Sequence, residues 1–262
     1  MKISVIGAGA MGGSMVKGLL QGNIFAAEDI MVADVSPQVL SEFEQAGVSV
    51  TTDNQQAATS DIVVVVVKPW LVQKVLQEIK PVLDYDRQVI IVIAAGVSSS
   101  NLTEWLGKGN KAILPQVFLA IPNIAIAMRT SMTFLVPVNA SYEKTRLVTD
   151  IFNDVGETII TDEKLLAGGT ALASSGIAYA MRYLRAAAEG GVELGFKADA
   201  AQKIVMQTMN GAVKLLQTSG LHPEQAIDLV CTPGGVTIKG LNEMEHAGFT
   251  SAVIRGLKAG VK

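Results

Sequence analysis

A glycine-rich segment close to the start of the chain, Gly7-Ala8-Gly9-Ala10-Met11-Gly12, constrains the fold more than any other feature. The apolar run Ile3–Ile6 precedes it, and a helical pattern over Met11–Leu20 follows it. In such a segment the first glycine permits a tight turn, the second lets backbone approach a pyrophosphate, and the third lets helix pack on strand. Unpaired N–H groups at the helix N-terminus then favour negative charge. The segment therefore predicts a strand–turn–helix unit that binds a dinucleotide.

An acidic residue at the end of the second predicted strand supports this interpretation. Asp34 closes the run Ile30–Asp34, about twenty residues beyond the glycine turn, where a carboxylate accepts hydrogen bonds from the adenosine ribose. A carboxylate there also repels a 2′-phosphate, and the following Val35–Gln38 contains no Arg or Lys to receive one. We therefore expect NADH to be favoured over NADPH. A second role, capping the next helix, is compatible with the first.

Apolar runs and helical patterns alternate through the first part of the chain, which predicts βαβ units and a Rossmann-type, doubly wound, mostly parallel sheet. The expected strands are Lys2–Ile6, Ile30–Asp34, Val48–Val50, Ile62–Val67, Val89–Ile93, Ala112–Leu114, Thr133–Val136 and Thr158–Ile160. The expected helices between them are Met11–Leu20, Pro37–Ala46, Leu71–Ile79, Asn101–Leu106 and Tyr142–Phe152.

The pattern changes after Ile160, where the chain becomes rich in Ala, Leu and Met and Asp162 can cap a helix. We expect a dinucleotide-binding domain at 1–160 and an all-helical dimerisation and substrate domain at 161–262. Segments such as Gly176–Leu194 are apolar on more than one face, as in helices buried in a large core or against a partner. Dimerisation is the prediction, and a well-packed monomer is the alternative.

Composition narrows the class of protein. The chain has 262 residues, room for one large or two modest domains, and a net charge of −3 without a basic patch for nucleic acid. The single Cys231 excludes an intramolecular disulfide and suits a reducing compartment. Met1-Lys2 leads straight into a strand, and the longest apolar run, Ile62–Val67, is too short to cross a membrane. We expect a cytoplasmic protein without membrane or nucleic-acid partners.

A second glycine-rich segment, Thr232-Pro233-Gly234-Gly235-Val236-Thr237, precedes a helical pattern at Ile238–Glu245. Glycines before a helix N-terminus expose backbone N–H groups to an anion, and the two threonines add hydroxyls. The segment could hold a small carboxylate without a charged side chain. The alternative is an ordinary loop and helix cap.

Acid–base groups are scarce. The two histidines, His222 and His246, have the positions of a helix-start turn and a helix C-terminus, and no residues have metal-ligand spacing, so we expect no metal. This scarcity suits an acceptor that is already electrophilic, such as an iminium ion. Lys68-Pro69 and Ala94-Ala95-Gly96 follow predicted strands, at the sheet edge where open α/β folds bind ligands.

Five segments in order resemble the pyrroline-5-carboxylate reductase family: the glycine turn, Val67-Lys68-Pro69, Ala94-Ala95-Gly96, Pro122-Asn123 and, most specifically, Thr232–Leu241. The resemblance runs the full length of the chain. It implies reduction of 1-pyrroline-5-carboxylate to proline with NAD(P)H, the final step of proline biosynthesis. It also implies an N-terminal Rossmann domain and a helical domain that interlocks two chains, often within larger rings.

The resemblance further implies site residues. The substrate carboxylate is expected against the backbone of Val236 and the hydroxyl of Thr237, which is the candidate catalytic residue. The substrate site is then Glu163, Thr170, Thr232, Gly234, Gly235, Val236 and Thr237. Asn54 is expected at the adenosine and the nicotinamide near Lys68-Pro69 and Ala94-Ala95. The cofactor site is then Ile6, Gly7, Ala8, Gly9, Ala10, Met11, Gly12, Asp34, Asn54, Val67, Lys68, Pro69, Ala94 and Ala95.

Two departures and two alternatives remain. Ser174-Ser175-Gly176-Ile177 occupies the positions where the family usually has Gly-Ser-Gly-Pro. Many members have Asn or Ser followed by Arg after the second strand and favour NADPH, whereas this chain has Asp34 there. A dehydrogenase of the 3-hydroxyacid type shares this architecture, but Lys203 and Lys214 lack the glycine-rich context of its catalytic lysine. A non-catalytic dinucleotide sensor is the other alternative, which turnover would distinguish.

Overall fold

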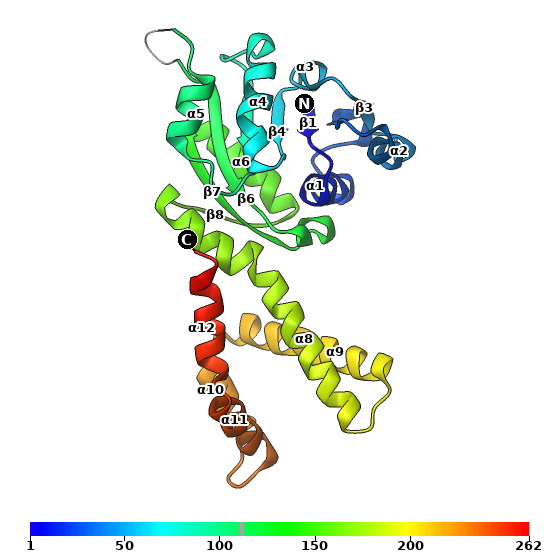
Figure 1. The fold of residues 1–262 in the computed structure, drawn as a ribbon, viewed down its shortest axis with the longest axis vertical. Coiled ribbons are helices and arrows are strands. Elements are labelled where there is room, and N and C mark those ends of the chain that lie inside the picture. The colour runs from blue at the N-terminus through cyan, green and yellow to red at the C-terminus, as the bar shows by residue number, and fades with distance from the viewer. Residues whose placement is uncertain (110–112, 262) are drawn as a thin grey trace. The chain divides into compact units, whose positions relative to one another are not determined.

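The computed structural model describes residues 1–109 and 113–261, and the chain forms two compact units, Met1–Ser175 and Gly176–Lys262. The first unit is a sheet with helices on both faces (Figure 1). Its strands are β1 Ile3–Ile6, β2 Ile30–Ala33, β3 Ser49–Thr51, β4 Ile62–Val65, β5 Val89–Val92, β6 Gln116–Ile121, β7 Ser131–Asn139 and β8 Gly156–Ile160. Its α-helices are α1 Ala10–Gln21, α2 Pro37–Gln45, α3 Asn54–Ala57, α4 Pro69–Ile79, α5 Ser99–Leu106, α6 Tyr142–Asp154 and α7 Leu166–Gly169.

The sheet has the strand order β3-β2-β1-β4-β5-β6-β7-β8, and every neighbouring pair is parallel except β6–β7. The strand β1 lies between β2 and β4, with Ile6 in register with Ala33 on one side and Val65 on the other. The predicted doubly wound, mostly parallel sheet is therefore confirmed. The segments that follow β1, β2 and β4 all leave the sheet at its carboxyl edge.

Two buried clusters, one on each face, hold this unit together. Because successive side chains of a strand point to opposite faces, Val64 belongs to the cluster that contains residues of α1, α2 and α6. Its neighbours Val63 and Val65 belong to the cluster that contains residues of α3, α4 and α5. The five consecutive valines Val63–Val67, here called the valine run, thus have the pattern of a strand buried on both faces.

One predicted strand is wrong. Of Ala112–Leu114, Ala112 lies outside the described residues, and Ile113 forms only an isolated bridge with Lys108. The strand is instead β6, which begins directly after Pro115. Because proline lacks an N–H, it is tolerated just before a strand, and here it marks the start rather than the end.

The described part of the second unit contains helices and no strand: α8 Gly176–Glu193, α9 Ala198–Ser219, α10 Pro223–Asp228, α11 Val236–His246 and α12 Phe249–Ala259 (Figure 1). Tyr183 of α8 and Phe249 of α12 make an edge-to-face contact with ring centroids 6.4 Å apart. The first compact unit includes residues 161–175, which the sequence pattern assigns to the second domain. The domain boundary at residue 160 stays a prediction.

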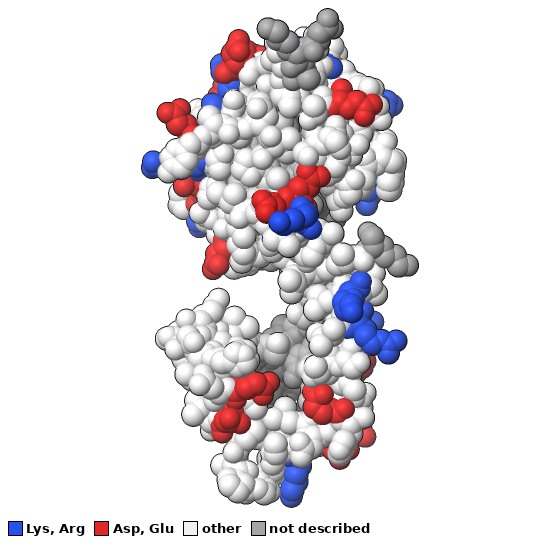
Figure 2. Space-filling view, turned by 90° about the vertical axis from the view of Figure 1, so that its left-hand side faces the viewer, with Lys and Arg blue, Asp and Glu red and all other residues white. Residues whose placement is uncertain are grey.

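Apolar side chains of the helical unit are exposed along its length. Among its described residues Ala201 alone is fully buried, whereas Leu194, Leu229 and Val236 are 70–85 % exposed. The face visible in Figure 2 correspondingly carries charged side chains only in a few separate groups. A single copy therefore leaves this unit without an apolar core. None of the helices in the described ranges is both long and apolar enough to cross a membrane.

Candidate cofactor and substrate sites

The glycine turn between β1 and α1 is shaped by close packing at its ends and open space at its centre. Gly7 has φ +101° and donates its N–H to Ala33 O at 2.7 Å, and a Cβ there would overlap the carbonyl oxygen of Val66. A Cβ at Gly12 would overlap the carbonyl oxygen of Gly7. Gly9 is exposed, with no heavy atom within 4 Å of where its Cβ would be.

Gly9 is also the N-cap of α1, and no side chain caps this terminus. The first N–H groups of a helix have no partner within the helix, so those of Ala10 and Met11 are free to bind an anion. Open space at Gly9 next to these donors fits the pyrophosphate of a dinucleotide. The positive φ of Gly7 and the close packing at Gly12 agree with their predicted roles, and the approach of a pyrophosphate at Gly9 stays a prediction.

The carboxylate of Asp34 is fixed between two backbone donors at the end of β2. Its Oδ2 accepts the N–H of Ala8, within the glycine turn, at 2.8 Å, and its Oδ1 accepts the N–H of Ser36 at 2.9 Å. The side chain therefore joins the loop after β2 to the turn after β1. The N-cap of α2 is Ser36, so Asp34 precedes the helix and does not cap it directly.

The segments after β4 and β5 leave the same edge of the sheet, because Val65 and Val92 are in register. Lys68 is the exposed N-cap of α4 and Pro69 its first residue, where a missing N–H costs nothing. Ala94 is buried and Ala95 exposed. Asn54, which is expected at the adenosine, donates its side-chain amide to Glu78 of α4 at 3.1 Å.

Glu163 and Thr170 belong to the first unit. The Oε1 of Glu163 accepts the N–H of Ser99, the first residue of α5, at 3.1 Å. Thr170 begins a π-helical segment, Thr170–Ser174, and its hydroxyl donates to Leu166 O at 2.7 Å. No sequence signal connects Glu163 with Ser99, which lies 64 residues earlier.

The segment Thr232–Thr237 belongs to the second unit and forms a tight turn before α11. Gly235 donates its N–H to Thr232 O at 2.9 Å, and Gly234 between them has φ +70°, which suits glycine. Gly235 is the N-cap of α11 and no side chain caps it. The N–H groups of Val236 and Thr237 are thus available to a carboxylate.

Other candidate residues have structural positions. His222 is the N-cap of α10, and its Nδ1 accepts the N–H of Glu224 at 3.3 Å, as expected for a helix-start turn. His246 lies in the last turn of α11, 3.5 Å from a carboxylate oxygen of Glu243. Cys231 is partly exposed. Within residues 1–109 and 113–261 no group of three or more His, Cys, Asp or Glu side chains could hold a metal ion.

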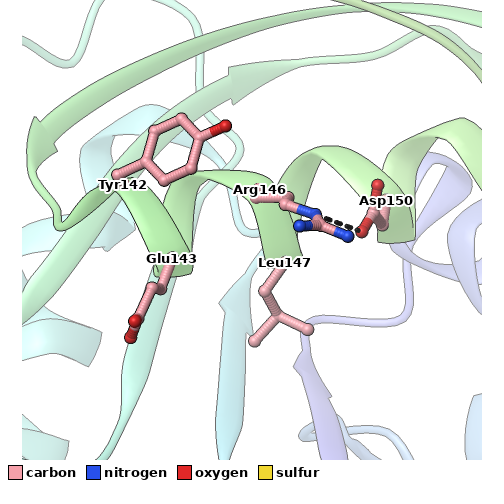
Figure 3. Close-up of a pocket in the computed structure, with 5 residues that line it drawn as sticks. All are labelled: Tyr142, Glu143, Arg146, Leu147 and Asp150. Atoms are coloured by element: carbon pink, nitrogen blue, oxygen red, sulfur yellow. Dashed lines mark ion pairs between the residues drawn. The ribbon is translucent and has the colours of Figure 1, made fainter.

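A shallow groove of about 300 Å³ on α6 lies outside these sites (Figure 3). It is lined by consecutive turns of one helix, and Arg146 pairs with Asp150 across it at 3.9 Å. The lining residues are Tyr142, Glu143, Arg146, Leu147 and Asp150, none of which was predicted to bind cofactor or substrate.

Comparison with known proteins gives matches over both parts of the chain. Residues 2–96 match the family model described as NADP oxidoreductase coenzyme F420-dependent, and residues 163–262 match that described as pyrroline-5-carboxylate reductase dimerisation. The chain is 36% identical to pyrroline-5-carboxylate reductase 1 of Dictyostelium discoideum, over 97% of this chain and 48% of that protein. It thus spans about half the length of that relative. It is 32% identical to pyrroline-5-carboxylate reductase of Pisum sativum, over 99% of this chain and 93% of that protein.

Solved structures of similar fold include members of the same family as these relatives. A Plasmodium falciparum pyrroline carboxylate reductase with NADP bound has a TM-score of 0.89 at 25% identity, covering 100% of this chain and 95% of that one. A Streptococcus pyogenes 1-pyrroline-5-carboxylate reductase has a TM-score of 0.85 at 32% identity, covering 100% and 96%. Fold and site thus define a nicotinamide-dinucleotide oxidoreductase with a Rossmann-type unit and a helical, self-associating part. The chain belongs to the pyrroline-5-carboxylate reductase family, and its reaction is the reduction of 1-pyrroline-5-carboxylate in proline biosynthesis.

Proposed function

We propose that this reductase prefers NADH. The support is the carboxylate of Asp34, which two backbone N–H groups hold at the end of β2 and which therefore cannot rotate away from a 2′-phosphate without losing both hydrogen bonds. Its remaining lone pairs can accept hydrogen bonds that the ribose hydroxyls of NADH donate. Val35–Gln38 supplies no cationic side chain to offset the repulsion.

We also propose which residues hold the cofactor. The turn from Ile6 to Gly12 binds the pyrophosphate through the free N–H groups of α1, and Asp34 binds the ribose. Asn54 lies toward the adenosine, which requires its amide to leave Glu78. The nicotinamide end is assigned to Val67, Lys68, Pro69, Ala94 and Ala95, whose segments leave the carboxyl edge of the sheet.

For the substrate we propose that the N–H groups of Val236 and Thr237 bind the carboxylate of 1-pyrroline-5-carboxylate. Gly234 and Gly235 keep this helix terminus free of side chains, and the Thr237 hydroxyl hydrogen-bonds the carboxylate or the ring nitrogen. Thr232, Glu163 and Thr170 complete the set of substrate residues. When bound, the reduced nicotinamide supplies the hydride, and the protein contributes by orienting and binding rather than by acid–base catalysis.

The direct test follows the absorbance of NADH and of NADPH during oxidation by 1-pyrroline-5-carboxylate and by related cyclic imines. We expect turnover with 1-pyrroline-5-carboxylate and a higher kcat/KM with NADH. A higher kcat/KM with NADPH contradicts the proposed preference. Oxidation that is faster with another cyclic imine contradicts a preference for 1-pyrroline-5-carboxylate over that imine.

The quaternary state and domain limits complete the proposal. The exposed apolar helices of the second unit support a two-fold dimer of this chain, and the domains are proposed at 1–160 and 161–262. The single Cys231 supports a location in the cytoplasm. Light scattering at micromolar concentration tests the dimer, and a stable, active monomer would contradict it.

A further inference from the structure

A buried polar cluster lies where β6 turns into β7. Asn123, Ser131 and Thr133 are 8%, 2% and 0% exposed. The N–H of Asn123 donates to Ser131 Oγ at 3.1 Å, and Ser131 Oγ lies 3.3 Å from Thr133 Oγ1. Buried polar groups need partners to offset their lost hydration, and these three provide them for one another. Asn123 is thereby held in one place by the strand that follows it.

The side chain of Asn123 makes two further hydrogen bonds of opposite sense. Its Oδ1 accepts the N–H of Ala125, and so caps the 3₁₀ helix Ile124–Met128, at 3.0 Å. Its Nδ2 donates to the carbonyl oxygen of Ala173 at 3.3 Å, 50 residues along the chain. A primary amide offers both an acceptor and donors at this length, whereas a carboxylate offers only acceptors and a serine hydroxyl is shorter.

The acceptor Ala173 lies in the π-helical segment Thr170–Ser174. The C-cap of this segment, Ser175, donates its N–H to Thr170 O at 2.8 Å. A π-helical turn is rare and is frequently found at functional sites. β7 fixes the start of this segment as well, because a Cβ on Gly169 would meet the ring of Phe134 at 2.8 Å. The segment that carries Thr170 is therefore held at both ends, by packing on one side and by Asn123 on the other.

We propose that Asn123 is a positioning residue for substrate binding: it holds the π-helical segment in the register that orients Thr170. The proposal rests on the proposed role of Thr170 as a substrate residue. Asn123 acts through the Ala173 carbonyl and does not itself touch the substrate. Its loss should consequently affect the affinity for the imine more than the affinity for the dinucleotide.

The test compares Asn123→Asp with the wild-type enzyme. Aspartate keeps the acceptor for Ala125 but places a carboxylate oxygen against the Ala173 carbonyl. We expect the KM for 1-pyrroline-5-carboxylate to rise on the order of tenfold. The dissociation constant of NADH, measured by fluorescence without substrate, should stay within about twofold. Asn139→Asp is the matched control, because Asn139 donates to Leu114 O and Pro115 O at the other end of β7, and it should leave both constants unchanged.

A second variant keeps the test decisive if Asn123→Asp fails to fold. Asn123→Ser retains a good capping residue and loses the bond to Ala173, so it should give the same rise in KM. A wild-type KM in a folded variant, an equal loss of NADH affinity, or failure of both variants to fold would overturn the proposal. The variant Thr170→Ala distinguishes failure of the proposed substrate role of Thr170 from failure of the positioning role of Asn123. If Thr170→Ala leaves the KM for the imine unchanged, the substrate role of Thr170 is wrong. If Thr170→Ala raises this KM and Asn123→Asp does not, only the positioning role of Asn123 is wrong. Non-additive effects in the double variant support the coupling.

Discussion

The charge of Asp34 should set the preference between NADH and NADPH, and Asp34→Asn removes that charge with almost no change of shape. In the wild-type chain both carboxylate oxygens are held, one by Ala8 N–H at 2.8 Å and the other by Ser36 N–H at 2.9 Å. Asparagine can accept only one of these bonds, because its NH₂ group faces the other donor. The variant should therefore bind NADH several-fold more weakly and NADPH more tightly.

The magnitude follows from Coulomb's law. A phosphate oxygen on the ribose would approach the carboxylate to about 5 Å, where two unit charges repel by about 3 kcal/mol at an effective dielectric constant of about 20 and by about 1 kcal/mol in water. Asp34, at the carboxyl end of β2, is partly buried, so the repulsion energy lies between these limits. About 1.4 kcal/mol corresponds to a tenfold change, so the ratio of kcat/KM for NADH to that for NADPH should fall about ten- to a hundredfold.

The assay measures kcat/KM for both coenzymes at saturating 1-pyrroline-5-carboxylate. Asp61→Asn is the control, because Asp61 also accepts a backbone N–H, from Lys2 at 2.8 Å, but lies before β4 at the opposite edge of the sheet. It should leave the ratio unchanged. Asp34→Ser should also relax the preference toward NADPH, because it removes the same charge. Because serine is too short to hold the N–H of Ala8, this variant should in addition weaken binding of both coenzymes. A ratio that Asp34→Asn leaves at the wild-type value would refute the electrostatic argument.

Three further predictions concern other parts of the chain. Gly12→Ala should destabilise the fold, because its Cβ would overlap Gly7 O, whereas Gly9→Ala should fold and lose dinucleotide affinity; thermal melts with and without NADH distinguish them. Thr237→Ala should lose about ten- to a hundredfold in kcat/KM for the imine at nearly constant NADH affinity, and Thr237→Ser should keep most activity; wild-type kinetics in the alanine variant would contradict this. Burial acts to raise the pKa of Asp154, but hydrogen bonds from a neighbouring loop and the charge of an arginine outweigh it and lower that pKa. Because the folded-state pKa is the lower one, this stabilisation is present at neutral pH and lost as pH falls through it, so the difference in unfolding free energy between wild type and Asp154→Ala should shrink in acid; a constant difference would contradict this.

Local pattern was sufficient for the elements with strong signals. The glycine turn, the valine run that overlaps β4 and the turn before α11 are each specified by consecutive residues, because glycine conformations and continuous apolar runs act over a few positions. β6 was misplaced because Pro115 carries the same signal at the start of a strand as at its end. The cofactor and substrate residues assigned from the family resemblance stay predictions.

The sequence by itself determined the class of fold, the dinucleotide turn and the family, since these depend on residues that are neighbours in the chain. The tertiary structure alone decided which side chains meet across it: Asp34 with Ala8, Glu163 with Ser99, and Asn123 with Ala173. These pairs are 26, 64 and 50 residues apart, and each joins a side chain to a backbone group. Every residue except proline offers the same N–H and all offer the same C=O, so the sequence does not mark the partner. Only the folded sheet, with its register and loops in place, selects one of them.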